Sequence, residues 1–326
     1  MTECPDCCES RGGCRERWVA PRRKALLSGI LNVDKPAGVT SHDVVDAIRR
    51  VSGQRKVGHA GTLDPLATGG LLVCLGQATR VSEYLMAGQK RYRATIVLGT
   101  TTDTYDADGK AVCSQGRTDF QRAEIEAALE HFRGRIEQVP PMYSAIKRNG
   151  QPLYRLAREG ETVDRPPRPV EVREFALVDW TSPSLIAEIT CSPGTYVRSL
   201  AHDLGQQLGS GAHLAALVRL RSGRFSLEQA ASLERLEEAF QHGQEDQFLI
   251  PLDEALLDWP AMVVNADQAR RIAQGQAIDS DGPVRGDGSS LCRAYGPEGE
   301  FLAIMQHRRS SERWQPKKVF VKQSQP

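Results

Sequence analysis

The sequence predicts a protein of mixed α and β structure with one large domain and one small domain. Three observations support this prediction. Helical and strand-like patterns alternate through most of the chain, glycine turns separate several strand-like stretches near its end, and 326 residues suffice for both parts. We expect a flexible extension over residues 1–27, a main domain over residues 28–250 and a β-rich module over residues 251–326.

The composition is that of an ordinary globular protein, with 40% hydrophobic and 25% charged residues. No apolar run approaches the length that spans a bilayer, and the N-terminus lacks the apolar core of a signal peptide. We therefore expect a cytoplasmic protein without membrane contact.

Positive charge is concentrated in two regions, although the net charge is only +1. Nine Lys and Arg residues against five acids lie in residues 133–173, and six against one lie in residues 305–326. Residues 232–258, between these regions, contain eight acids and one Arg. Two basic regions suit a phosphate backbone held at two points, but ordinary solvated surface gives the same pattern.

The eight cysteines fall into two groups. Four lie in predicted strands and are expected to be small buried hydrophobic side chains, namely Cys74, Cys113, Cys191 and Cys292. The other four lie in the extension, at Cys4, Cys7, Cys8 and Cys14. Their first pair has half of a zinc-ligand pattern, but no second pair with suitable spacing follows, so we expect a disordered tail without a metal.

The first ordered element is a strand over residues 29–34, which ends at the turn Lys35-Pro36-Ala37-Gly38. Thr40 and Asp43 then have the spacing of a capping box, and apolar residues at helical spacing lead to Gly53. A helix is therefore predicted directly before the most distinctive segment of the chain.

That segment is the loop Val57-Gly58-His59-Ala60-Gly61-Thr62-Leu63-Asp64-Pro65-Leu66-Ala67-Thr68-Gly69-Gly70, followed by an apolar run that predicts a buried strand. Its four glycines and one proline allow a rigid backbone that is neither helix nor strand. Asp64 stands between leucines, where burial and a fixed rotamer would make a carboxylate reactive as a nucleophile or general base. The Asp-Pro pair is equally a common start of a turn.

A strand over residues 91–98 is predicted next, and its alternation places Tyr92 on the apolar face. This tyrosine is either a core residue or a ring offered to a base in a pocket. Three aspartates then precede Gly109 as in a calcium-binding loop. The first and twelfth positions of such a loop would be Thr104 and Gln115, which are not carboxylates, so a hairpin turn is predicted instead.

Arg198 falls in the first turn of a helix predicted after Ser192-Pro193-Gly194. A cation there opposes the helix dipole, so a nearby carboxylate or phosphate is expected to compensate it, unless it is an ordinary surface arginine. Ser226 and Gln229 predict the cap of a further helix. The other predicted elements are helices near residues 78–86, 118–134, 153–158 and 266–274 and a strand hairpin over residues 170–179 and 184–191.

With these segments identified, the chain resembles the TruB-type tRNA pseudouridine synthases, a family that converts uridine 55 of the tRNA T-loop to pseudouridine. Its motifs occur in the family's order: Leu31-Asn32-Val33-Asp34-Lys35-Pro36-Ala37-Gly38, then Gly58 to Gly69, Lys90-Arg91-Tyr92-Arg93-Ala94, Pro141-Met142-Tyr143-Ser144-Ala145 and Gly194-Thr195-Tyr196-Val197-Arg198. Residues 253–320 resemble the PUA-type RNA-binding module at the end of these enzymes, whereas residues 1–24 lie outside the resemblance.

The resemblance implies a fold and a set of roles. The fold is an α+β catalytic domain around a mixed, largely antiparallel central sheet with flanking helices, plus a small β-barrel-like PUA-type domain. Asp64 would be the catalytic carboxylate, and Arg198 would pair with it. The other implied substrate-binding residues are His59, which supports displaced T-loop bases, Tyr92, which stacks on the target uracil, and Tyr196 and Leu217, which line the uridine pocket.

The chemistry of such a reaction requires no cofactor and no metal, because moving the base from N1 to C5 involves no net redox change. The target nucleotide must leave the RNA stack and enter a pocket with apolar and aromatic walls. Asp64 could attack C1′, add to C6 or remove the 2′ proton, and the sequence does not decide among these routes. Arg198 would keep the carboxylate ionised in such a pocket.

Two other functions are compatible with parts of the sequence. A non-catalytic RNA-binding or tRNA-folding module would use the same basic surfaces, and an N-glycosylase would use a similar carboxylate with a positioned water. Pure binding does not require a carboxylate where a polyanion docks, so Asp64, Tyr92 and Arg198 together favour the synthase. We expect the T-arm of tRNA as the partner, and a monomer without an obligatory protein partner.

Overall fold

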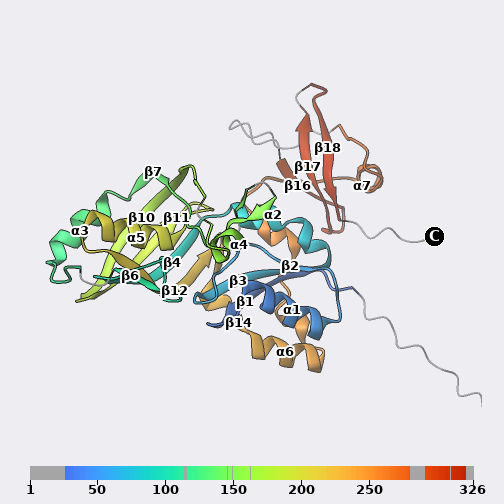
Figure 1. Cartoon of the computed structure of the whole chain (residues 1–326). Coiled ribbons are helices and arrows are strands. Elements are labelled where there is room, and N and C mark those ends of the chain that lie inside the picture. Colours follow the sequence, from blue (N-terminus) through green and yellow to red (C-terminus); the bar gives the residue numbers. More distant parts are fainter. Residues whose placement is uncertain are drawn as a thin grey trace, which may run out of the picture.

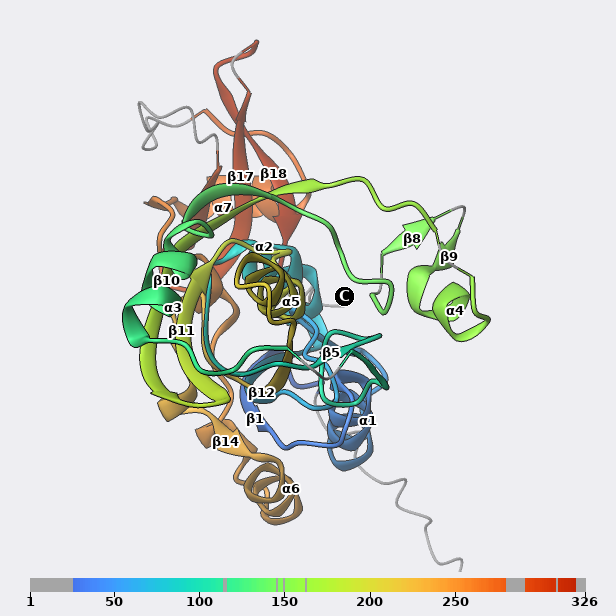
Figure 2. The same ribbon diagram turned by 60° about the vertical axis from the view of Figure 1, so that its left-hand side comes forward.

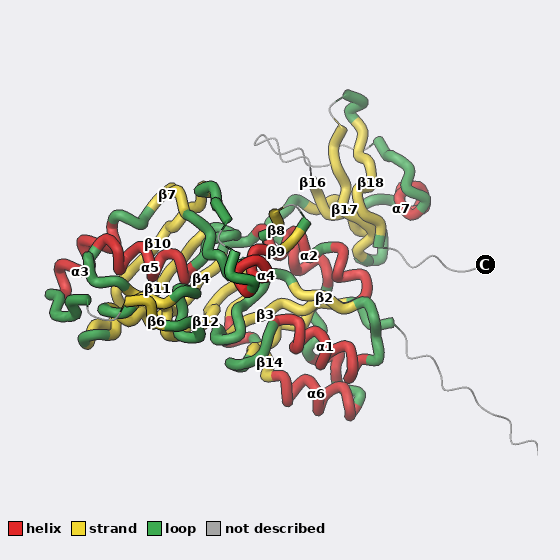
Figure 3. The backbone as a smooth tube through the Cα atoms, viewed as in Figure 1, coloured by secondary structure: helices red, strands yellow, loops and turns green. Residues whose placement is uncertain are grey.

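The computed structural model describes residues 26–113, 116–144, 146–148, 150–161, 163–279, 291–308 and 310–320. A large sheet covered by helices and a small terminal sheet make up the molecule (Figures 1 and 3). The cysteines predicted to lie in a disordered tail, and the glycine turns predicted between residues 281 and 288, lie outside the described residues. No helix within the described ranges is both long and apolar enough to cross a membrane.

A mixed sheet forms the centre of the main domain. Its strands are β1 (Gly29–Lys35), β2 (Val57–His59), β3 (Thr68–Leu75), β4 (Lys90–Leu98), β7 (Gly134–Gln138), β10 (Arg168–Thr181), β11 (Ser184–Cys191), β12 (Ala212–Ser222), β13 (Phe225–Ser226) and β14 (Ala231–Ser232). The order is β14-β1-β3-β12-β4-β11-β10-β7, with β2 paired to β3 and β13 to β12. Pairs β1–β14 and β3–β12 are parallel and the other pairs are antiparallel, which confirms the predicted largely antiparallel sheet.

Five helices flank this sheet: α1 (Ser41–Ser52), α2 (Ser82–Ala87), α3 (Arg122–Glu130), α5 (Val197–Gln207) and α6 (Leu233–His242). The capping box predicted for the first of them is present, with Asp43 N donating to Thr40 Oγ1 at 3.1 Å and Thr40 N donating to Asp43 Oδ2 at 2.7 Å. Helices α1, α3 and α5 bury their apolar stripes in the main core against one face of the sheet. Helix α6 lies beside α1 at one end (Figures 1 and 2).

Strand β3 explains why the segment after the glycine-rich loop is apolar on both faces. Leu71 and Val73 belong to the main core under the helices, whereas Leu72 and Cys74 belong to a second core on the opposite face. Because successive strand residues point to opposite sides, a strand buried on both sides must be apolar throughout. The strand that follows Asp64 is therefore packed against apolar side chains on both of its faces.

Two small hairpins project from the main domain. One consists of β5 (Thr101–Thr102) and β6 (Ala111–Cys113), which confirms the hairpin predicted around the aspartates. The other consists of β8 (Lys147–Arg148) and β9 (Gln151–Pro152) and leads into α4 (Leu153–Arg158), the short helix predicted there. Figure 2 shows β8, β9 and α4 standing away from the sheet.

The terminal module is a four-stranded sheet of order β15-β16-β17-β18. It contains β15 (Ala261–Val263), β16 (Leu291–Tyr295), β17 (Phe301–Arg308), β18 (Arg313–Val319) and the helix α7 (Ala266–Ala273). The second core joins it to the main domain, because Ile304 packs there with Leu72 and Leu85. The segment that leads into this module is also held to the main domain. Ile250 exchanges backbone hydrogen bonds of 2.8 and 2.9 Å with Ile30 of β1.

Three local predictions were wrong. The helix predicted near residues 78–86 is divided into a 3₁₀ helix over Gly76–Arg80 and the short helix α2. The helix predicted after Ser226 is only a 3₁₀ turn over Leu227–Gln229, because the chain becomes extended at Ala230 to pair β14 with β1. Cys113 is exposed rather than buried, since it lies in the hairpin strand β6, which no second layer covers. Cys74, Cys191 and Cys292 are buried as predicted.

Candidate active site

The loop predicted around Asp64 (residues 57–70, the Asp64 loop) is held by hydrogen bonds to its backbone. The buried hydroxyl of Ser41 donates to Leu63 O at 3.0 Å and accepts from Leu63 N at 2.8 Å. On the other side of the carboxylate, Gly38 N donates to Pro65 O at 2.9 Å. The two ends of the segment are strands, β2 and the start of β3, contrary to the prediction of a backbone that is neither helix nor strand. Residues 60–67 between them have no regular secondary structure and are tied to the start of α1.

The carboxylate of Asp64 is held by Arg198. The Nε and Nη2 atoms of Arg198 lie 2.9 Å from Oδ2 and 3.2 Å from Oδ1 of Asp64. Arg198 has 6% of its side chain exposed and Asp64 34%, so the arginine is sealed while the carboxylate reaches the surface of the site. Such a two-point contact fixes the orientation of the carboxylate as well as its charge.

A second carboxylate completes this group. Asp106 Oδ2 lies 3.3 Å from Arg198 Nη1, and Asp106 has 6% of its side chain exposed. Burial raises the pKa of Asp106, although Thr104 and the Arg198 charge oppose that rise. Arg198 also donates to the carbonyls of Thr104 at 3.3 Å and Tyr143 at 2.8 Å, so both of its Nη atoms are engaged, while Nε contacts Asp64 Oδ2 as an ion pair without hydrogen-bond geometry.

The position of Arg198 follows from the start of α5. Tyr196 is the residue that caps this helix, and its backbone exchanges hydrogen bonds of 2.8 and 3.0 Å with the side chain of Gln138 in β7. Arg198 therefore lies at the positive end of the helix dipole, and the two carboxylates supply the compensation that the sequence predicted. Burial raises the pKa of the Tyr196 phenol.

Tyr92 and Leu217 lie on neighbouring strands next to the Asp64 loop. Tyr92 in β4 is 8% exposed and Leu217 in β12 is 7% exposed, and both pack in the main core with Leu63 and Ala67 of the loop. Burial raises the pKa of the Tyr92 phenol. The Tyr92 ring thus forms an apolar wall next to the Asp64 loop.

His59 stands apart from the other predicted residues. It lies in β2, and within the described part of the chain no hydrogen bond or ion pair joins it to them. Its buried Nδ1 lacks a partner there, and burial lowers its pKa, with smaller contributions from Arg219 and His42. The imidazole of His59 is therefore neutral and half-buried, at the start of the Asp64 loop.

Three residues near the site were not predicted: Asp106, Lys35 and Arg219. The ammonium of Lys35 is fully buried and donates to the carbonyls of Pro36, Val39 and Pro65 at 2.9, 2.7 and 3.3 Å. Arg219 in β12 is 1% exposed and donates a hydrogen bond to a backbone carbonyl of the Asp64 loop. The alternation of β12 was a usable signal, because it places Arg219 on the same face as Leu217.

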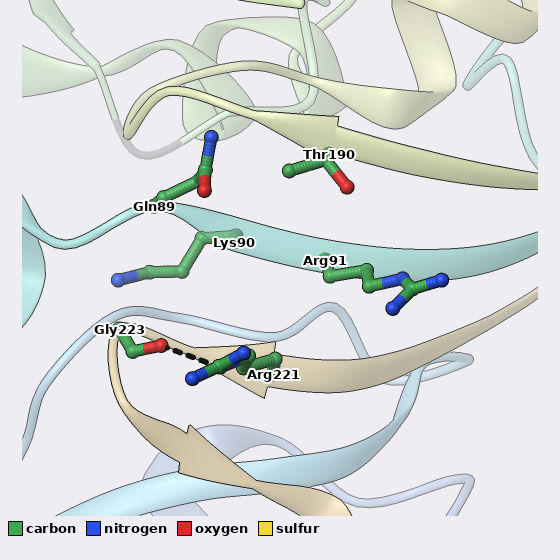
Figure 4. A pocket seen from close by; sticks show the side chains of 6 residues that line it. All are labelled: Gln89, Lys90, Arg91, Thr190, Arg221 and Gly223. Atoms are coloured by element: carbon green, nitrogen blue, oxygen red, sulfur yellow. Dashed lines mark hydrogen bonds between the residues drawn. The ribbon is translucent and has the colours of Figure 1, made fainter. Parts of the chain in front are cut away.

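A cavity of about 300 Å³ lies at the end of β4, with Lys90 and Arg91 in its wall. Figure 4 shows these side chains together with Arg221 of β12, whose Nε donates to Gly223 O at 3.0 Å. The buried Lys90 ammonium donates to the carbonyls of Leu85, Met86 and Gly88, and burial lowers its pKa to about 8. This cavity is distinct from the Asp64 site.

The geometry describes a carboxylate fixed by a buried guanidinium beside an apolar, aromatic wall. Among the described residues no group of three or more His, Cys, Asp or Glu side chains is arranged to hold a metal ion. The partly exposed carboxylate of Asp64 can act as a nucleophile or base.

Comparisons with known proteins identify the family of the chain. Residues 49–197 match the model of the TruB family pseudouridylate synthase N-terminal domain, and residues 198–257 match that of the tRNA pseudouridylate synthase B C-terminal domain. The protein named tRNA pseudouridine synthase B from Pseudomonas syringae pv. syringae is 43% identical over 287 residues, which cover 87% of this chain and 92% of that protein. Its namesake from Dehalococcoides mccartyi is 42% identical over 298 residues, covering 91% and 98%.

A solved structure described as "Crystal Structure of a Cbf5-Nop10-Gar1 Complex" has the same fold. It is 26% identical with a TM-score of 0.69, and the match covers 90% of this chain and 85% of that one. Together with the identity to the bacterial proteins, this likeness extends from the main domain into the terminal sheet. The chain therefore belongs to the TruB family of pseudouridylate synthases and is an isomerase.

Proposed function

We propose that this protein is a tRNA pseudouridine synthase that isomerises uridine 55 in the T-loop, with Asp64 as the catalytic carboxylate. The observation that carries this proposal is the two-point contact between Arg198 and Asp64 beside the buried ring of Tyr92. The names of the bacterial relatives support tRNA as the substrate.

In this proposal each predicted residue has one task. The target uridine flips out of the RNA stack and enters the space above Tyr92, whose ring stacks on the uracil while the base is detached and rotated. Tyr196 and Leu217 line the pocket, and His59 supports the bases displaced from the T-loop. Asp64 acts near C1′ and C2′ of the ribose, and Arg198 holds its carboxylate in a fixed orientation.

The basic surfaces would hold the RNA backbone. Arg155 in α4 is exposed and lies in the basic region of residues 133–173 on the projecting element of Figure 2. The terminal sheet, which we assign as the PUA-type RNA-binding module, carries the second basic region in β18. Two separated basic elements on either side of the site suit the recognition of a folded RNA by its shape.

The reaction is tested with an unmodified tRNA transcript tritiated at uracil C5 and the purified protein, without cofactor or added metal. We expect tritium release without loss of the base, confirmed by the mass of the T-loop fragment. Base loss would identify a glycosylase instead. Tight binding without release would identify the non-catalytic RNA-binding module.

The role of Asp64 is tested with Asp64→Asn, which removes the charge with little change in volume. We expect tritium release to fall below detection, while tRNA affinity stays within about twofold of wild type because the RNA contacts remain. Asp253→Asn is a control that changes a partly buried aspartate bonded to Tyr295, at the base of the terminal sheet. Retained activity of Asp64→Asn would exclude Asp64 as the catalytic group.

A further inference from the structure

The buried guanidinium of Arg219 joins both ends of the Asp64 loop. Its Nε donates to Gly70 O at 2.7 Å, after the carboxylate in sequence. Its Nη2 and Nη1 donate to the carbonyls of Gly61 at 3.2 Å and Thr62 at 3.4 Å, before the carboxylate. One planar group with fixed donor positions therefore sets the separation of the two ends of the loop.

Arg219 is held differently from Arg198. Within the described residues it forms no ion pair with a carboxylate, although it is 1% exposed. A buried cation without a counter-ion is costly, so its hydrogen bonds to loop carbonyls are the compensation that keeps it in place. Displacement of the loop would remove these hydrogen bonds from the buried Arg219 guanidinium. The observed loop conformation is therefore favoured.

The backbone at Arg219 reinforces this contact. Gly69 pairs with Arg219 where β3 and β12 run parallel. A Cβ on Gly69 would lie 2.5 Å from Arg219 O, and Gly69 has a φ of +98°, so only glycine allows this approach. Arg219 is also the cross-strand partner of Tyr92. Arg219 therefore pairs with β3, binds the Asp64 loop and lies opposite Tyr92, whose ring we propose stacks on the uracil.

We propose that Arg219 is a positioning residue for the isomerisation, acting through the Asp64 loop. By fixing both ends of the loop it holds the Asp64 carboxylate where it meets the flipped nucleotide. This inference rests on the proposed role of Asp64. Because Arg219 is sealed beneath the loop, RNA binding does not depend on it, and its loss affects the rate of reaction rather than affinity.

The test measures single-turnover tritium release with enzyme in excess, and tRNA affinity by filter binding, for Arg219→Met and Arg219→Lys. We expect both variants to react about 100-fold more slowly, since a misplacement of about 1 Å at a reacting group has an effect of this size. Affinity should stay within about twofold. Lysine keeps the charge, but its single ammonium cannot reach both ends of the loop.

Arg221→Met is the matched control. Arg221 lies two residues further along β12, is exposed, and lines the separate cavity of Figure 4. We expect it to react at the wild-type rate. In a third variant, Arg219→Ala, added methylguanidinium should restore part of the rate by occupying the vacated space, which a general loss of folding would not allow.

A wild-type rate in Arg219→Met, or a loss confined to tRNA affinity, would overturn the proposal. If Arg219→Met does not fold, Arg219→Lys decides: a slow reaction with retained affinity supports the positioning role, and a wild-type rate refutes it. An active Asp64→Asn would refute the proposed role of Asp64, on which this inference rests, whereas a wild-type protein that releases no tritium would refute the proposed function itself. An inactive Asp64→Asn with a fully active Arg219→Met would refute only the role of Arg219.

Discussion

Arg198 is shared by two carboxylates with different environments. Asp64 has 34% of its side chain exposed and is available to a substrate, whereas Asp106 has 6% exposed and is not. Asp106 therefore serves as an anchor for the guanidinium, and the orientation of that guanidinium in turn sets the carboxylate of Asp64. The cluster carries two negative charges and one positive, so Arg198 is held from both sides.

Asp203 in α5 carries a half-buried carboxylate outside this cluster. No ion pair or hydrogen bond to its side chain is present in the described residues, and burial raises its pKa to about 6. Between the unfolded pKa near 4 and the folded value, the native state binds more protons than the unfolded state. The contribution of Asp203 to stability is therefore lost as the pH rises through this window.

Asp203→Asn removes this titration. We expect the variant to gain about 1–3 kcal/mol relative to wild type between pH 4 and pH 8, the range allowing for partial exposure of the side chain. Urea unfolding at both pH values measures the difference. Asp258→Asn, at an exposed position, should show no pH-dependent gain. A stability difference between Asp203→Asn and wild type that is the same at both pH values would contradict the prediction.

At the scale of elements, the N-terminus of α1 serves two purposes. Thr40 caps the helix, and the next residue, Ser41, exchanges two hydrogen bonds with the backbone of Leu63 beside Asp64. The capping geometry that begins the helix thereby also fixes the Ser41 side chain against the loop. Helix α1 is packed in the main core through its apolar stripe, so the loop is attached to a rigid element.

Ser41→Ala should destabilise the protein by about 1–3 kcal/mol, because it leaves the buried N–H and C=O of Leu63 without partners. Ser52→Ala is a matched control in the same helix. Its buried hydroxyl donates to Ile48 O at 2.6 Å, a carbonyl inside the helix, and accepts a long hydrogen bond of 3.4 Å from Gln54 N, so its removal should cost less than about 1 kcal/mol. Urea unfolding of both variants measures the difference, and equal costs would refute the special role of Ser41.

Elements with local signals were predictable from the sequence. The capping box at Thr40 and the alternation around Tyr92 each lie within a few residues, and each formed as predicted. The glycine-rich segment is an irregular loop only over residues 60–67, because its two ends belong to the paired strands β2 and β3. Asp106 pairs with an arginine far away in the sequence, so the local pattern of its hairpin does not indicate this role. The alternation of β12 indicates that Arg219 shares a face with Leu217, but the backbone carbonyls that Arg219 and Lys35 bind, up to 158 residues away, leave no side-chain pattern in the sequence.

At the scale of the whole molecule, the terminal sheet is joined to the main domain by a shared core. Ile304 of β17 packs with Ile30, Leu72 and Leu85, so apolar residues of both parts exclude water together. Tyr84 and Trp259 add an edge-on ring contact with centroids 4.8 Å apart. A boundary near residue 250, as the sequence predicts, therefore separates two sheets but not two independent cores.

Ile304→Ala tests this coupling, because Ile304 is fully buried in the shared core while Met305, its neighbour, is fully buried in the terminal sheet's own core. Each substitution should cost about 2–5 kcal/mol. Hydrogen exchange should then differ between the two variants. Ile304→Ala should accelerate exchange in β3, across the boundary, as well as in β17, since it leaves a cavity in the core that also contains Leu72 of β3. Met305→Ala should accelerate exchange only in the terminal sheet, and unchanged exchange of β3 in Ile304→Ala would mean that the two sheets open independently.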